Sequence, residues 1–152
     1  MTLSVDISVS ENIQAGNDDV PEPAQIQNWA KAAYLNDVPA VASLMVTDAD
    51  EMQQLNLQYR AQDKPTNVLS FPMQAVLEDE VLLLGDIALC APVINQQARQ
   101  QAKPEMAHWA HMVVHGMLHL QGYDHIDNAE AEEMEHMEIE ILAQLGFDNP
   151  YQ

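Results

Sequence analysis

The sequence predicts a single α+β domain that spans residues 1–152. Segments whose apolar residues alternate, or run continuously over a short stretch, are interspersed with segments whose apolar residues recur at helical spacing. The chain has neither an internal repeat nor a linker, and its length allows roughly 70% of the surface of the unfolded form to be buried. One packed layer structure of strands and helices is therefore expected.

The first part of the chain predicts two strands and two helices. Residues 2–9 alternate between apolar and polar side chains, which is typical of a half-buried strand. A polar loop to Pro23 precedes a helix over residues 24–35, and a strand follows over residues 41–46. An acidic run then predicts the N-cap and first turn of a helix that ends near Arg60.

Two further strands are predicted before the chain becomes helical. Residues 66–71 are rich in β-forming side chains, and Pro72 is expected to close this strand. Residues 81–90 are apolar enough for a strand that is buried on both faces, with an interruption at Gly85-Asp86. An acidic connection at residues 78–80 lies between them.

Three helices complete the prediction. Pro92 suits the first turn of a helix that reaches about residue 101, and Pro104 opens the next helix. The last helix is expected over residues 129–145 and ends at Gly146, because glycine is favoured directly after a helix.

The strongly acidic composition argues against unaided binding to nucleic acid. The net charge of −19 comes from 24 acids against five bases, whereas phosphate affinity normally depends on Lys and Arg. The acids are unevenly distributed: seven lie in residues 127–140, while residues 52–77 hold two bases and one acid. The run at 127–140 is expected to form a solvated helix face. Weak, salt-sensitive RNA affinity is predicted, with substrate delivered by a partner.

The composition also predicts a cytoplasmic location. Cys90 is the only cysteine, so an internal disulfide is impossible and a reducing compartment is suitable. The first residues lack the basic start and apolar run of a signal peptide. No apolar run reaches the roughly 20 residues that a membrane span requires.

The run from His115 to His125 is the most informative part of the sequence. Residues four apart share one face of a helix, so His115 and His119 can bind the same ion. Gly122 allows a sharp turn that returns His125 as a third ligand. Three imidazoles suit Zn²⁺, and three protein ligands with an open position are typical of a catalytic zinc. One zinc ion is predicted, although imidazoles also accept Ni²⁺ and Co²⁺.

The remaining histidines carry less information. His108 and His111 lie on the same helical arc as His115, and the opposite helix face is apolar and expected to be core. Their roles and that of His136 stay open between a hydrogen-bonded structural residue and a place beside the metal or the substrate.

The ligand spacing equals that of the metzincin metalloproteases, His-Glu-x-x-His-x-x-Gly-x-x-His. In this chain Gly116 stands where those enzymes have the glutamate. A zinc peptidase needs that glutamate to accept a proton from metal-bound water, and glycine has no group that can do so. A zinc peptidase is therefore an alternative only, and another reaction is expected.

The same run resembles the H-G-x-L-H-L-x-G-Y-D-H signature of the YbeY family, bacterial zinc-dependent endoribonucleases of ribosomal RNA maturation and ribosome quality control. Residues 60–72 and 84–87 resemble the second and third blocks of that family, in the same order. The resemblance covers roughly residues 48–151. It implies a mixed sheet of about four strands with five or so helices, in a zincin-like core with a metal-binding helix.

The resemblance further implies a single-strand-specific metallo-endoribonuclease that hydrolyses RNA phosphodiester bonds. Its implied role is 3′-end maturation of small-subunit ribosomal RNA and ribosome quality control. The partners would be single-stranded or ribosomal RNA and a ribosomal subunit or ribosomal proteins, with neither a membrane nor DNA expected. His115, His119 and His125 would be the zinc ligands, and Arg60 the functional arginine across the cleft. A guanidinium beside a zinc ion suits the charge that develops on a cleaved phosphodiester.

Several points stay open at this stage. Asp124 could orient an imidazole, act as a base or cap the turn, and Lys64 could contact phosphate or be solvated. No residue is an unambiguous general base, so either water or a ribose 2′-hydroxyl could attack. A non-enzymatic ribosome-associated factor is the remaining alternative, because the acidic charge and nine methionines would suit a binding surface.

Overall fold

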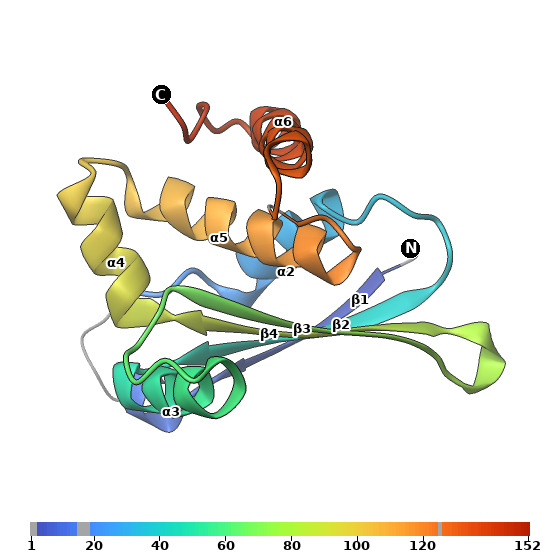
Figure 1. Ribbon diagram of the computed structural model, residues 1–152, viewed down its shortest axis with the longest axis horizontal. Helices are drawn as coiled ribbons and strands as arrows, with labels where there is room; N and C mark the ends of the chain where they lie inside the picture. Colours follow the sequence, from blue (N-terminus) through green and yellow to red (C-terminus); the bar gives the residue numbers. More distant parts are fainter. Residues whose placement is uncertain (1–2, 15–18, 125) are drawn as a thin grey trace.

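The computed structural model describes residues 3–14, 19–124 and 126–152, so the predicted ligand His125 lies outside the described residues. Within these ranges the chain forms four strands and six α-helices, which confirms the α+β class (Figure 1). The strands are β1 (Leu3–Val9), β2 (Ala40–Thr47), β3 (Val68–Val76) and β4 (Leu82–Cys90). The helices are α1 (Glu11–Gln14), α2 (Pro23–Ala32), α3 (Ala49–Arg60), α4 (Ala91–Gln100), α5 (Glu105–Leu120) and α6 (Asn128–Gln144).

The sheet is mixed, as predicted. Its strand order is β1-β2-β4-β3, with β1, β2 and β4 parallel and β3 antiparallel to β4. The parallel pairs require crossover connections, and the helices α2 and α3 supply part of these. The antiparallel pair β3–β4 is joined by a short hairpin that contains the acidic 3₁₀ turn Glu78–Glu80.

Two strand predictions were wrong in detail. β3 does not end at Pro72 but continues to Val76, with Pro72 paired to Gly85. A proline is tolerated there because β3 is an edge strand, where a missing N–H costs least. β4 is not interrupted at Gly85-Asp86 either; the irregularity is a register shift against Val41 and Ala42 of β2. The strand is not buried on both faces throughout, because Asp86 is exposed.

The helix predictions differ from the structure by at most three residues at an end. α2 ends earlier than expected, and α4 and α6 each begin one residue before the predicted start. The helix α1 was missed because its four residues are too few to show an apolar period in a polar loop. The N-cap of α3 is Asp48, whose carboxylate accepts a hydrogen bond of 2.8 Å from the amide of Glu51.

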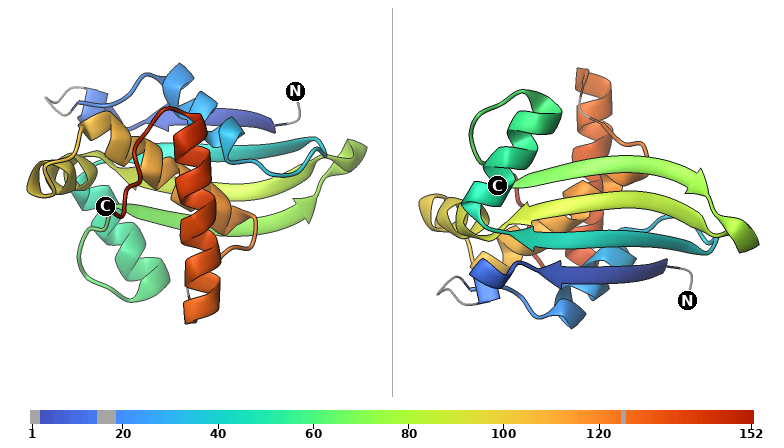
Figure 2. Two further views of the ribbon diagram at one scale, coloured as in Figure 1. Left: turned by 90° about the horizontal axis from the view of Figure 1, so that it is seen from above. Right: turned by 90° about the horizontal axis from the view of Figure 1, so that it is seen from below.

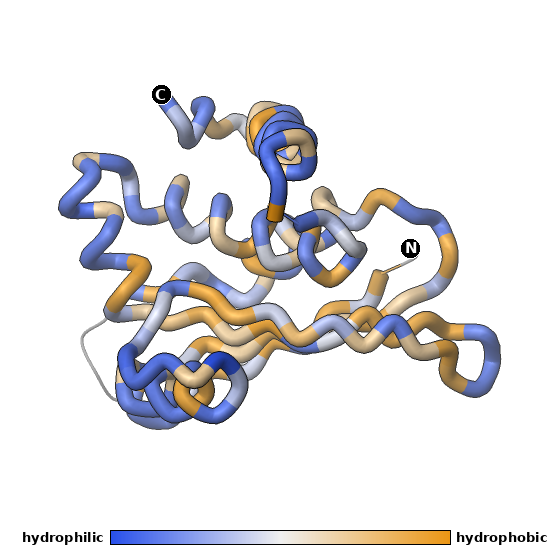
Figure 3. Tube along the Cα trace, viewed as in Figure 1, coloured by the Kyte–Doolittle hydropathy of each residue, from blue (hydrophilic) through white to orange (hydrophobic). Residues whose placement is uncertain are grey.

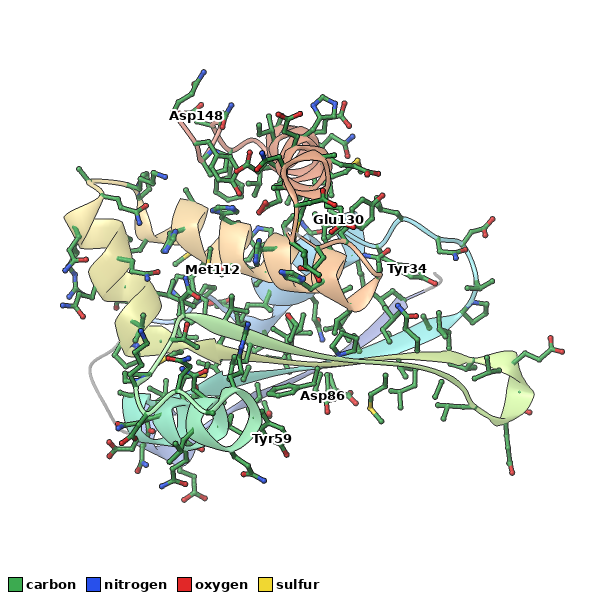
Figure 4. The ribbon with its side chains drawn as sticks, viewed as in Figure 1. Tyr34, Tyr59, Asp86, Met112, Glu130 and Asp148 are labelled. Atoms are coloured by element: carbon green, nitrogen blue, oxygen red, sulfur yellow. The ribbon has the colours of Figure 1, made fainter. Side chains whose placement is uncertain are left out.

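Most of the helices form one thick layer on a single face of the sheet. α2, α4 and α5 cover that face, α6 crosses the outside of α5, and α3 lies on the opposite side (Figures 1 and 2). The side chain of Asp86 lies on the side of the sheet away from this layer (Figure 4). Hydrophobic stretches follow the strands, whereas the loop before α5 and the tip of the hairpin between β3 and β4 are mainly hydrophilic (Figure 3).

Helix α5 is the centre of the core. The residues opposite its histidine face are all fully buried, as predicted: Trp109, Ala110, Val113, Val114, Met117 and Leu118. The indole N–H of Trp109 donates a hydrogen bond of 2.8 Å to the buried side chain of Asn95 on α4. This satisfies the one polar atom of a large core side chain. No helix among the described residues is long and apolar enough to cross a membrane.

Candidate active site

Two of the predicted ligands converge on one point. His115 and His119 lie one turn apart on α5, and their Nε2 atoms are 3.1 Å apart. Their rings are nearly perpendicular, with an interplanar angle of 79° and centroids 4.6 Å apart. Two nitrogen ligands of a tetrahedral zinc ion, each at 2.0–2.1 Å, are separated by about 3.3 Å. The observed nitrogen pair therefore has a spacing that suits two ligands of one zinc ion.

The tautomer of His115 also suits metal binding. Its Nδ1 lies 3.0 Å from Oε1 of Glu138 on α6. An ionised carboxylate only accepts hydrogen bonds, so Nδ1 carries the proton and donates it. A ring that donates from Nδ1 presents Nε2, the atom that faces His119, as its metal-binding nitrogen. The donor set of this pair therefore fits a metal ion.

The predicted turn at Gly122 is present. The φ angle of Gly122 is +99°, in the region that favours glycine, and its amide donates to the carbonyl of His119 at 3.1 Å. The chain thus reverses directly after α5 and leads toward His125, which lies outside the described residues. In the described ranges, no group of three or more His, Cys, Asp or Glu side chains is placed to hold a metal ion.

Gly116 brings α5 close to the sheet. A Cβ atom added at this position would lie 3.0 and 3.1 Å from two carbon atoms of Ile87 on β4, and 3.4 Å from Oγ of Ser70 on β3. Position 116 therefore faces tightly packed strands. A glutamate at this position would have to displace the fully buried Ile87, so the structure explains why a peptidase-like base is not found here.

Glu138 is a buried acid that the sequence analysis missed. It is 1% exposed, and it accepts hydrogen bonds from His111, His115 and Tyr151. Burial opposes its ionisation, but the hydrogen bonds from His111 and His115 outweigh burial and lower the pKa of this carboxyl from 4.5 to about 2. The expectation of a solvated acidic face holds for the other six acids of residues 127–140 and is wrong for Glu138.

The sequence did contain a signal for this burial. Glu138 lies four residues after Met134 and three before Ile141, and both are buried. It therefore occupies a position of the apolar stripe by which α6 packs on α5. An acid in the middle of an apolar stripe is rarely left without a partner, because an unpaired buried carboxylate is costly.

The other histidines have separate environments. Nε2 of the buried His108 lies 3.0 Å from Oε1 of Gln97, and the same oxygen accepts a hydrogen bond of 3.1 Å from Asn67. Burial, together with the charges of His111 and Lys103, lowers the pKa of His108 from 6.5 to about 4. His136 is exposed and pairs with Glu140 on the outside of α6 at 3.3 Å.

Arg60 and the histidine pair face the same cleft, which has a volume of about 530 Å³ and is called the histidine cleft below. Its walls come from the end of α3, the start of β3 and the C-terminal half of α5. They comprise Tyr59, Arg60, Thr66, Asn67, Val68, Ser70, Phe71, Pro72, His115, His119 and Asp124. The structure thus brings together four of the five residues predicted for the site.

The loop between α3 and β3 positions Arg60. The side chain of the buried Asn56 donates a hydrogen bond of 2.8 Å to the backbone carbonyl of Lys64, and the backbone carbonyl of Asn56 accepts one of 3.2 Å from the amide of Gln62. The C-cap Ala61 has a φ angle of +56°, which ends α3 directly after Arg60. Lys64 itself lines a neighbouring depression rather than the histidine cleft.

Two aromatic side chains form part of the cleft wall. The rings of Tyr59 and Phe71 meet edge to face, with centroids 5.0 Å apart, and Tyr59 is 59% exposed. Tyr59 lies at the end of α3, on the side of the sheet opposite Met112 of α5 (Figure 4). Neither ring was predicted for the site from the sequence.

An α+β fold with a cleft that joins a histidine pair to an arginine is the arrangement that the resemblance implied. The family described as Endoribonuclease YbeY matches residues 10–146. Endoribonuclease YbeY of Alteromonas mediterranea is 51% identical to this chain, and the alignment covers 99% of this chain and 98% of that protein. The chain therefore belongs to the YbeY family of endoribonucleases.

A solved structure supports the fold. The solution structure of TM1509 from Thermotoga maritima matches with a TM-score of 0.54 and 22% sequence identity. The match covers 94% of this chain and 92% of that protein. At this identity the likeness establishes the fold alone.

Proposed function

We propose that the protein is a cytoplasmic, single-strand-specific zinc endoribonuclease, built as one domain over residues 1–152. Its reaction is the hydrolysis of RNA phosphodiester bonds, in 3′-end maturation of small-subunit ribosomal RNA and in ribosome quality control. Family membership supports the endoribonuclease activity. The observation that carries the proposal is a single cleft that holds both the His115–His119 nitrogen pair and the guanidinium-bearing Arg60.

The proposed metal ligands are His115, His119 and His125. The 3.1 Å separation of the two Nε2 atoms and the 3.0 Å contact of Nδ1 of His115 with Glu138 support the first two. The position of Gly122 supports the third, because the chain reverses there immediately after α5. When bound, zinc would supply a Lewis acid for the phosphoryl oxygens. In this proposal α5, packed on the sheet, is the metal-binding helix of a zincin-like core.

Arg60 is proposed to hold the scissile phosphate. Its guanidinium is always charged and forms two parallel hydrogen bonds to phosphate oxygens, which fixes the phosphate as negative charge increases during cleavage. It is exposed in the cleft wall, where a phosphate can reach it. Asp124 lines the same cleft and is the proposed acceptor of a proton from the nucleophile.

The aromatic wall accounts for the proposed preference for single strands. A base must be unstacked before it can lie on an aromatic side chain, and stacking of this kind tolerates any sequence. Tyr59 is exposed beside Arg60 and is held by its edge-to-face contact with Phe71. A base adjacent to the bound phosphate is therefore proposed to stack on Tyr59.

A ribosomal subunit or ribosomal protein is the proposed partner. Five bases against 24 acids leave little electrostatic attraction for RNA, so the affinity for naked RNA should be low and should fall as salt increases. A partner that presents the RNA would replace this missing attraction.

The test compares cleavage of single-stranded and duplex RNA by protein that carries one equivalent of zinc. Cleavage of the single strand alone, lost in His115→Ala and in Arg60→Ala, would support the proposal. His136→Ala is the matched control, because His136 lies on the outside of α6 and should leave cleavage unchanged. The proposal is wrong if single-stranded RNA stays intact or if both site variants cut it as well as the parent.

The end groups of the products identify the nucleophile. A 2′,3′-cyclic phosphate would show attack by the ribose hydroxyl, whereas a 5′-phosphate with a free 3′-hydroxyl would show attack by water.

A further inference from the structure

Glu138 is a buried acid of α6 to which the proposed reaction assigns no role. α6 is the outermost helix and carries its other acids on the solvent side, yet this carboxylate is 1% exposed against α5. A buried carboxylate is retained only where donors compensate its lost hydration. Three side chains supply such donors: His111, His115 and Tyr151.

The donors are divided between the two oxygens. Oε1 lies 2.9 Å from Nε2 of His111 and 3.0 Å from Nδ1 of His115, on consecutive turns of α5. Oε2 accepts a hydrogen bond of 2.7 Å from the hydroxyl of Tyr151, which also lies 3.1 Å from Oε1. The carboxylate is therefore held from three sides, and its own position is fixed.

The contact with His115 is on the side of the ring away from the histidine cleft. Nδ1 faces Glu138, while Nε2 faces His119. A hydrogen bond at the first nitrogen fixes both the rotation of the ring and the position of its lone pair.

If Glu138 served only to pack α6 against α5, a charged side chain would not be needed at this position. The neighbouring positions of the α6 stripe, Met134, Ile141 and Leu142, are apolar and fully or almost fully buried. An apolar residue at 138 would pack the two helices at least as well, since replacing buried ionic groups by apolar ones is often neutral or stabilising.

We propose that Glu138 is a positioning residue of the metal site, which holds His115 with Nε2 directed at the ion, and that Tyr151 and His111 in turn hold Glu138. The inference rests on the proposed function, because it requires that His115 bind the metal. It links α6 and the segment after it, which line no part of the histidine cleft, to the affinity of that cleft for zinc.

The test measures zinc affinity of the metal-free protein by competition with a chelator of known affinity. Glu138→Gln keeps the shape of the side chain but removes the charge, and zinc affinity should fall about 10- to 100-fold. Glu138→Asp, which keeps the charge, should restore part of the loss. Tyr151→Phe leaves Glu138 in place and should cause a smaller loss. His136→Gln, on the same helix but exposed, should change nothing.

Two further measurements separate positioning from packing. The absorption spectrum of the Co²⁺-substituted protein should change in Glu138→Gln, because a rotated imidazole alters the ligand field. In the metal-free parent at pH 8, nitrogen NMR should find the proton of His115 on Nδ1. This second measurement needs no variant, so it remains decisive even if Glu138→Gln does not fold.

The outcomes distinguish the two proposals. If the parent binds zinc and His115→Ala does not, the metal site stands; zinc affinity of Glu138→Gln within twofold of the parent would then overturn the role of Glu138 alone. A proton on Nε2 of His115 would overturn it as well. If parent and His115→Ala bind zinc equally, or neither binds it, the metal site fails and the inference fails with it.

Discussion

The two halves of the histidine face of α5 carry the same residue type at similar helical spacing, three residues apart in one half and four in the other, and differ in access to solvent. His108 and His111, in the N-terminal half, are buried and paired with Gln97 and Glu138. His115 and His119, in the C-terminal half, line an open cleft and direct two nitrogens at one point. The comparison teaches that helical spacing places imidazoles on one face, whereas partners and access decide which of them can meet a ligand.

The largest difference between the halves should be catalytic. His115→Ala removes one of the two converging nitrogens, and RNA cleavage should fall by at least about 10³-fold, because a Lewis acid contributes several kcal/mol to such a reaction. His108→Ala should retain cleavage within about fivefold, since His108 does not line the histidine cleft. Single-turnover cleavage of a labelled RNA measures both. Equal losses of RNA cleavage in the two variants would show that the two halves do not differ in their part in catalysis.

Arg60 provides a second test of the difference between the two halves, because it lines the same cleft as His115 and His119, whereas His108 and His111 do not line that cleft. Arg60→Ala should lower kcat/KM by about 10²- to 10³-fold through loss of charge stabilisation at the phosphate. Arg60→Lys keeps the charge but not the forked geometry, so it should recover only part of this loss. Zinc affinity should stay the same in both variants. Full activity in Arg60→Lys would show that charge alone is sufficient.

His108, in the N-terminal half of the histidine face, should make the free energy of unfolding depend on pH. His108 is buried and its Nδ1 has no hydrogen-bond partner among the described residues, and its pKa is lowered from 6.5 to about 4. Between these values the unfolded chain binds a proton that the folded chain does not, so the free energy of unfolding falls as pH decreases from 6.5 to 4. The fall attributable to this residue is up to about 3 kcal/mol.

Urea unfolding at a series of pH values measures this effect. His108→Gln should be flatter than the parent between pH 6.5 and 4, because glutamine does not titrate and can still bond to Gln97. The expected cause is excluded if parent and variant lose stability in parallel over that interval.

The smallest expected effect concerns the side of α5 that faces the sheet. In Gly116→Ala the new methyl group would lie 3.0 Å from a carbon atom of the fully buried Ile87. Crowding of this kind costs about 1–3 kcal/mol, and the higher helix propensity of alanine offsets about 1 kcal/mol. A net loss of about 1 kcal/mol is expected in urea unfolding. The double variant Gly116→Ala with Ile87→Val should recover part of the lost stability. If Gly116→Ala alone is more stable than the parent, the strands move aside at little cost and the expected crowding is absent.

Much of the fold followed from local patterns. The apolar face of α5, an N-cap at the acidic start of α3 and the turn at Gly122 were all expected, because each depends on residues close together in the sequence. The passage of β3 through Pro72 was not, because it depends on β3 being an edge strand. Strand order depends on contacts between segments that are distant in the sequence, so local patterns do not predict it.

The site divides in the same way. His115, His119 and Arg60 were predicted from spacing and from the resemblance to a family, and they line one cleft. It missed Glu138 because this acid lies in a run of exposed acids, and its partners on α5 are 23 and 27 residues away in the sequence. Only the packing of α6 on α5 distinguishes it from its neighbours.

The irregular edge strand β3 affects how copies of this protein can associate through their sheets. An edge strand offers unpaired backbone groups to which a strand of another molecule can bond. Here Pro72 removes one donor, and the register shift between Pro72 and Ala75, with Gln74 at a φ of +48°, breaks the regular ladder. Pro72 also lines the histidine cleft. The irregular edge therefore discourages a strand-swapped or sheet-extended dimer at the border of the cleft, and leaves that border open for the RNA strand that is proposed to bind there.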